Sequence, residues 1–187
     1  MGVKEMHALQ EWNDFFQWLM DRERRVVHTD PNDAGGQTCW GISRRYNPNW
    51  KGWALVDNGA RAAELEPVVK EFYENLLGKY WDILGDKIRE AFCDAYVNMG
   101  GGRKGDKNED AVELLQRSVN CLNAKTVLEV DGLFGNNTGR AVMDEDPIAL
   151  AYTFCALRMC EYRKRRNKNY ETGWLNRVQL LIEYISK

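Results

Sequence analysis

The sequence predicts a mainly α-helical fold with one irregular loop region near the N-terminus. Apolar residues recur at helical spacing from about residue 65 to the C-terminus, whereas turn-forming residues are concentrated before that point. The chain has 187 residues, of which 44% are hydrophobic and 29% charged, values that are ordinary for a globular protein. This length suffices for one compact domain or for two small, closely packed ones.

The N-terminal part should contain one helix followed by loops. Residues 6–22 form the helix, because apolar residues share one face of it: Leu9, Trp12, Phe15, Phe16, Leu19 and Met20. The helix should end near Glu23, since the β-branched Val26-Val27 and then Asp30-Pro31 follow. Val26-Val27 and Trp40-Gly41-Ile42 are each candidates for a short strand.

Helical patterns continue through the remainder of the chain, six or seven helices in all. Pro67 is expected in the first turn of the helix that begins near residue 65. Asp146 as N-cap and Pro147 as first residue should begin a long helix that ends near residue 166. The other expected helices cover residues 88–99, 112–122 and 136–144, and the stretch after Gly173.

Composition excludes several classes of partner. The net charge of −2 favours neither nucleic acid nor a membrane surface, and no apolar run is long enough for stable membrane insertion. With only two histidines in the chain, a histidine-based metal site is not expected. The five scattered cysteines are expected to be reduced thiols.

A cysteine-peptidase reading of Gln37-Thr38-Cys39-Trp40 is also excluded. The thiolate of such an enzyme needs a histidine base, which in the papain-like order follows the cysteine. Both histidines, His7 and His28, precede Cys39.

The stretch 23–43 is the candidate active site. Glu23 ends the first helix, and a loop rich in Asp, Pro, Asn and Gly follows it. Glycoside hydrolysis needs a carboxylic acid that can protonate the glycosidic oxygen. The negative end of a helix dipole favours the protonated form of a carboxyl group, so Glu23 is the candidate proton donor.

The order of motifs in this stretch resembles glycoside hydrolase family 108. The motifs are Glu23, Asp30-Pro31, Asp33, Gly35-Gly36, Thr38 and Gly41-Ile42-Ser43. The family comprises bacterial and phage N-acetylmuramidases with a lysozyme-like fold, often labelled secretion activators. The later chain resembles the peptidoglycan-binding domain that accompanies this family, through Asp94, Asn98, Gly100, Asp131-Gly132, Phe134-Gly135, Thr138 and 173–177.

The resemblance implies two parts packed as one compact unit: a catalytic part over residues 8–91 and a helical peptidoglycan-binding part over 92–184. It implies a cofactor-free peptidoglycan hydrolase that cleaves the β-1,4 bond between N-acetylmuramic acid and N-acetylglucosamine, with Glu23 as acid. Asp33 and Asp30 are the candidate second catalytic groups, although aspartates in such loops also cap turns.

Four further residues are candidate substrate contacts, each with a structural alternative. Thr38 would position water or substrate, or pack against the loop. Trp40 would stack on a sugar or lie in the core, whereas the core is favoured for Trp50 and Trp53. Asp94 and Asn98 lie one helical turn apart, where they would line the cleft or satisfy buried backbone groups. 

The sequence departs from the family pattern beside the catalytic position. Arg24 and Arg25 replace two glycines and Val26 replaces an aromatic residue. Arginine in a left-handed conformation costs about 1 kcal/mol relative to glycine, and positive charge favours the ionised form of a nearby carboxylate. A non-catalytic peptidoglycan-binding protein, or an accessory factor in secretion or phage release, is therefore the alternative function.

The expected partners are the glycan strands of peptidoglycan. The N-terminal residues contain no continuous apolar segment typical of a signal peptide. We therefore expect synthesis in the bacterial cytoplasm and action at the cell wall or periplasm, with a holin or another export partner as the route.

Overall fold

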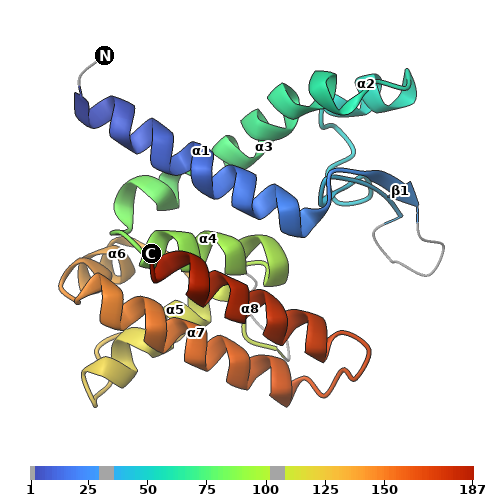
Figure 1. Ribbon diagram of the computed structural model, residues 1–187. Coiled ribbons are helices and arrows are strands. Elements are labelled where there is room, and N and C mark those ends of the chain that lie inside the picture. The colour runs from blue at the N-terminus through green and yellow to red at the C-terminus, as the bar shows by residue number, and fades with distance from the viewer. Residues whose placement is uncertain (1–2, 30–35, 102–107) are drawn as a thin grey trace. The chain divides into compact units, whose positions relative to one another are not determined.

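The computed structural model describes residues 3–29, 36–101 and 108–187 and is dominated by helices (Figure 1). The described ranges contain α1 (Val3–Glu23), α2 (Gly52–Asp57), α3 (Ala62–Ile83), α4 (Ile88–Met99), α5 (Ala111–Leu122), α6 (Asn136–Met143), α7 (Pro147–Lys164) and α8 (Glu171–Ile185). The strands are β1 (Val27–Thr29), β2 (Gln37–Cys39) and β3 (Ile42–Ser43). The expected mainly α, lysozyme-like class, with its irregular region near the N-terminus, is confirmed.

Contacts along the chain divide it into two compact units, Met1–Gly78 and Lys79–Lys187. Each unit has its own buried core. The functional division into residues 8–91 and 92–184 remains a prediction.

The first unit places a small antiparallel sheet directly after α1. Its strands pair in the order β1-β2-β3, with Val27 opposite Cys39 and Thr38 opposite Ser43. Trp40 and Gly41 form the turn between β2 and β3, where the sequence suggested a strand. The end of α1 is therefore followed directly by the sheet that contains this turn.

Helix α1 is fixed against α3 by aromatic and polar contacts. The ring of Phe16 lies 6.4 Å from that of Tyr73, and Trp12 Nε1 donates to Glu74 Oε1 at 3.1 Å. Lys70 Nζ donates to Asn13 Oδ1 at 2.5 Å. These contacts orient the apolar face of α1, and with it the last turn.

The expectation that Pro67 lies in a first helical turn is wrong. Helix α3 begins at Ala62, so Pro67 lies in its second turn. The backbone N–H of Arg61 donates to Glu64 Oε2 at 2.8 Å, which stabilises the earlier start by satisfying a helix-terminal donor.

The second unit is a helical bundle arranged around α7. This helix packs against α4, α5 and α8 (Figure 1). It begins as expected, because Asp146 Oδ1 accepts from the N–H of Ala149 at 2.7 Å and Pro147 occupies the first turn. Among the described helices, none combines the length and hydrophobicity needed to cross a bilayer.

Candidate active site and a second pocket

Glu23 lies on the buried side of α1. It follows Phe16, Leu19 and Met20 at helical spacing, and those three side chains are fully buried. Glu23 itself is half-buried. Its carboxylate is therefore directed from the last turn of the helix toward the interior of the first unit.

The carboxylate of Glu23 lies against Gly41. A β-carbon on Gly41 would stand 2.5 Å from Glu23 Oε2 and 2.7 Å from the hydroxyl of Tyr73. Gly41 also has a φ of +82°, a conformation that favours glycine. Only glycine leaves room for both groups, so the β2–β3 turn forms a closely fitted seat for the acid.

Tyr73 holds this seat from the side of α3. The side chain is buried, and its hydroxyl donates a 2.8 Å hydrogen bond to the carbonyl oxygen of Trp40. The same hydroxyl lies beside the Glu23 carboxylate at Gly41. Sequence analysis did not single out Tyr73, because a tyrosine within an apolar helical stripe is normally a core residue.

Trp40 contributes its backbone to the seat and its ring to the core. The residue is only 1% exposed and has a φ of +48°, which is unusual for a side chain other than glycine. The guanidinium of Arg25 lies 5.7 Å from its ring. Of the two roles considered for Trp40, burial favours packing over stacking on a sugar.

Thr38 lies in β2, next to this turn. It is 9% exposed and is paired with His28 on one side and Ser43 on the other. The position of the Thr38 side chain is compatible both with packing against the loop and with contact to a ligand. Asp30 and Asp33, the candidate second catalytic groups, lie outside the described residues, and their roles remain predictions.

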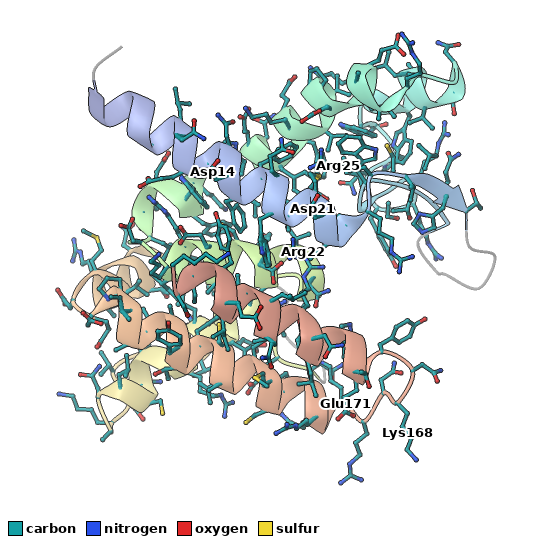
Figure 2. All side chains as sticks on the ribbon, viewed as in Figure 1. Asp14, Asp21, Arg22, Arg25, Lys168 and Glu171 are labelled. Atoms are coloured by element: carbon teal, nitrogen blue, oxygen red, sulfur yellow. The ribbon has the colours of Figure 1, made fainter. Side chains whose placement is uncertain are left out.

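Arg24 and Arg25, which follow the last residue of α1, have separate local roles. Arg24 has a φ of +57°, so an arginine does occupy the left-handed position after the helix. Arg25 Nη2 lies 3.3 Å and Arg22 Nη1 3.9 Å from the carboxylate oxygens of Asp21 (Figure 2). Arg22 also donates to the carbonyl of Trp18 at 2.9 Å. The guanidinium groups of Arg22 and Arg25 thus contact Asp21.

Cys39 does not provide a nucleophile. It is fully buried in β2, and burial raises the pKa of its thiol to about 11. The thiol is therefore protonated at neutral pH, and protonated thiols are poor nucleophiles.

Asp94 and Asn98 belong to the second unit and form part of a buried polar network. Asp94 is 0% exposed; its Oδ2 pairs with Arg158 Nη1 at 2.6 Å and its Oδ1 with Arg177 Nη2 at 2.7 Å. Burial would raise the pKa of Asp94, but the guanidiniums of Arg177 and Arg158 outweigh it and lower the pKa. Asn98 Oδ1 accepts from the hydroxyl of Tyr162. This burial favours the structural role for Asp94.

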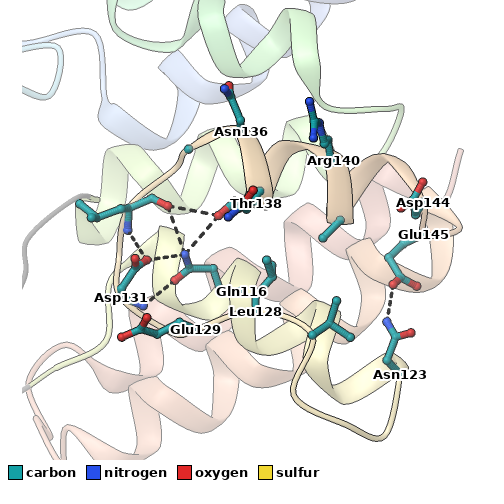
Figure 3. Close-up of a pocket in the computed structure, with 15 residues that line it drawn as sticks. Gln116, Asn123, Leu128, Glu129, Asp131, Asn136, Thr138, Arg140, Asp144 and Glu145 are labelled. Carbon is teal, nitrogen blue, oxygen red and sulfur yellow. Dashed lines mark hydrogen bonds between the residues drawn. The ribbon is translucent and has the colours of Figure 1, made fainter.

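The second unit also contains a pocket of about 680 Å³ between the loop that precedes α6 and the ends of α5 and α6 (Figure 3). Gln116 is buried beneath it and organises its wall. Its Nε2 donates to Asp131 Oδ1 at 2.7 Å and to Thr138 Oγ1 at 3.2 Å, while its Oε1 accepts from the N–H groups of Asp131 and Gly132. The Asp131-Gly132 motif and Thr138 are therefore brought to one wall by a single amide.

The mainly α fold of the chain, with Glu23 at the end of the first helix, is of the lysozyme-like class. Residues 16–100 match the family model described as "Glycosyl hydrolase 108". The matched range contains Glu23, Thr38, Trp40, Asp94 and Asn98.

A solved structure extends the likeness of fold over nearly the whole chain. "Structure of Brucella abortus SagA" matches with a TM-score of 0.67 and 21% sequence identity, and covers 94% of each chain. At this identity the likeness shows the fold alone. No curated protein sequence matches this chain significantly.

Proposed function

We propose that the protein is an N-acetylmuramidase that cleaves the β-1,4 bond between N-acetylmuramic acid and N-acetylglucosamine in peptidoglycan. The observation that carries the proposal is the close seating of the Glu23 carboxylate against Gly41 and Tyr73. It is supported by the match of residues 16–100 to the model of a glycosyl hydrolase family. A carboxyl group fixed at one point is what proton donation to a glycosidic oxygen requires.

In this mechanism Glu23 protonates the leaving oxygen as the glycosidic bond breaks. A second carboxylate then acts as nucleophile or activates a water molecule. Asp30 and Asp33 are the proposed sources of that group, because they lie in the sequence between β1 and β2, the strands that follow Glu23. Thr38, on β2, is proposed to position water or substrate near the same turn.

The second unit is proposed to bind the same polymer. Its pocket is lined by amide, hydroxyl and carboxylate groups from Asn136, Asn137, Thr138, Asp131 and Glu129, which suit a polar ligand such as peptidoglycan. Action at the cell wall, reached through a holin or another export partner, is part of this proposal.

Purified bacterial cell walls provide the test. Wild-type protein should reduce the turbidity of a wall suspension, and Glu23→Gln should abolish that loss while still sedimenting with the walls. Asp30→Asn and Asp33→Asn, measured in parallel, would identify the second group by a comparable loss of rate. Equal clearing by wild type and Glu23→Gln would reject Glu23 as the acid.

A non-catalytic peptidoglycan-binding protein is the second candidate. The observation that favours it is Arg24 in the left-handed position where the family has glycine. Sedimentation of the wild type with walls, without any loss of turbidity, would support this function. Absence of both, with recovery of a protein partner, would support an accessory role in secretion or phage release.

A further inference from the structure

A groove lies within the first unit, on the exposed side of α3. Its volume is about 460 Å³, within the range of about 300–1,000 Å³ typical of small-ligand sites. One wall is the segment 47–51, and the other is a single face of α3 that presents Val68, Glu71, Phe72, Asn75 and Leu76 at helical spacing.

The ring of Trp50 is fixed in this groove. A β-carbon on Gly52 would lie only 2.2 Å from Cζ2 of Trp50, so the ring rests directly on the glycine backbone. Trp53 packs edge-on against it at 5.0 Å and Phe72 at 6.1 Å. Trp53 is buried in the core, whereas Trp50 remains half-buried and lines the groove.

Packing alone does not explain a tryptophan at position 50. Its indole N–H is buried and has no hydrogen-bond partner among the described residues. A buried donor without a partner is unfavourable, and a phenylalanine would provide an aromatic surface without one. The indole ring lines the groove, where it offers a ligand a larger apolar surface than phenylalanine would.

The polar groups of the groove are mainly amides. Asn47, Asn49 and Asn75 line it, and each side chain offers both a donor and an acceptor. Within the described parts of the chain, the exposed amides of Asn49 and Asn75 have no intramolecular partner. Lys51 and Glu71 neutralise each other through a 2.5 Å ion pair. The groove therefore favours an uncharged ligand with a flat apolar face and amide-like groups.

We infer that this groove is a carbohydrate subsite for an N-acetylated hexosamine unit. The apolar face of the pyranose would pack on Trp50 and Phe72, and the acetamido group would exchange hydrogen bonds with Asn49 or Asn75. The inference rests on the proposed function for its substrate class, glycan, but it concerns a site distinct from the seat of Glu23.

The test uses the full-length Glu23→Gln protein and chitotetraose, the β-1,4-linked tetramer of N-acetylglucosamine. Binding is measured by isothermal titration calorimetry and by the indole N–H signals in a ¹⁵N NMR spectrum, where loss of one signal in Trp50→Phe identifies Trp50. The signal of Trp50 should shift on titration. Asn49→Ala combined with Asn75→Ala should weaken binding about tenfold or more, the effect of losing one or two hydrogen bonds.

Two controls define the outcome. Asn58→Ala removes an exposed amide outside the groove and should leave chitotetraose affinity unchanged. Cellotetraose, which lacks acetamido groups, should bind more weakly than chitotetraose. An unshifted Trp50 signal, or equal affinity in the double asparagine variant, would overturn the inference. Groove-dependent binding without any wall hydrolysis by the wild type would instead reject the muramidase function and keep the subsite.

Discussion

The carboxylate of Glu23 and the backbone of Gly41 are in such close contact that any side chain at position 41 would displace the acid. The first atom of such a side chain would stand 2.5 Å from Glu23 Oε2. The acid at the end of α1 is thus positioned by a turn that lies eighteen residues later in the sequence, with Tyr73 of α3 completing the contact. This arrangement leads to specific expectations for stability and activity.

Gly41→Ala should damage both properties. Its β-carbon clashes with Glu23 and Tyr73, and its φ of +82° strains any other residue. We expect the free energy of unfolding to fall by about 2–4 kcal/mol and wall hydrolysis by about a hundredfold, since small displacements of a catalytic group have large effects.

Gly59→Ala is the matched control for Gly41→Ala. Gly59 has a similar φ of +71°, but a β-carbon there would meet nothing within 4 Å. It should lose only about 1 kcal/mol, from backbone strain, and retain activity. Equal losses in chemical denaturation and in turbidity assays of the two variants would show that the clash with Glu23 is unimportant.

Arg24→Gly should stabilise the protein. Arg24 is exposed and has a φ of +57°, so glycine would remove about 1 kcal/mol of backbone strain. Arg25→Gly is the comparison, because it should give no gain: it removes the hydrogen bond of Arg25 to Gln17 Oε1 and the contact with Asp21. Thermal unfolding of the two variants measures this difference in stability. A stability gain in Arg25→Gly, with none in Arg24→Gly, would contradict the prediction.

Asp94→Asn should strongly destabilise the second unit. It leaves Arg158 and Arg177 without their buried carboxylate, and breaking a buried pair of this kind typically costs about 3–5 kcal/mol. Because the two guanidiniums lower the pKa of Asp94 despite its burial, the charged carboxylate stabilises the fold above its unfolded value of 3.8. That stabilisation is lost as the pH falls through the lower, folded value.

Urea denaturation of wild type and Asp94→Asn at pH 7 and at successively lower pH below 3.8 measures this effect, and the difference between the two proteins should shrink as the pH falls. Asp57→Asn removes an exposed carboxylate that pairs with Arg44 at 2.6 Å and should change stability little. A difference between wild type and Asp94→Asn that does not depend on pH would contradict the electrostatic explanation.

Glu90→Gln should have the opposite effect at neutral pH. Glu90 is buried, burial raises the pKa of its carboxyl group, and its Oε2 has no hydrogen-bond partner in the described parts of the chain. The charged form is therefore unfavourable in the folded protein, and the substitution should stabilise it by about 1–2 kcal/mol at pH 7. The gain should disappear below about pH 4.5, the unfolded value, where both states are protonated.

The exposed Glu183→Gln on α8 serves as the control for Glu90→Gln and should show no comparable gain. Melting temperatures across this pH range test the expectation. A loss of stability in Glu90→Gln at pH 7 would mean that Arg89 stabilises the charged carboxylate more than burial disfavours it.

Local signals in the sequence predicted much of the fold. Asp146 and Pro147 were sufficient to predict the start of α7, and the position of Arg24 just past the end of α1 indicated the left-handed conformation that it adopts. Such features depend on residues that are adjacent in the sequence. Pro67 predicts a later start for α3 than the structure has, because the cap formed by Arg61 and Glu64 begins the helix earlier.

The contacts of the sites could not be predicted in the same way, because they join distant segments. Asp94 finds its partners 64 and 83 residues away, at Arg158 and Arg177. The contact of Tyr73 with the Trp40 carbonyl also depends on tertiary packing. Sequence spacing identified Asp94 as a residue of interest but could not distinguish a cleft residue from a buried ion pair.

The most direct test of the proposed function is to identify the sugar at the new reducing ends when purified peptidoglycan is digested. Products are reduced with borohydride and analysed by mass spectrometry, for the wild type and for Glu23→Gln. The wild type should produce fragments that end in reduced N-acetylmuramic acid, and Glu23→Gln should produce none. Fragments that end in reduced N-acetylglucosamine, or the same fragments from both proteins, would contradict a muramidase in which Glu23 donates the proton.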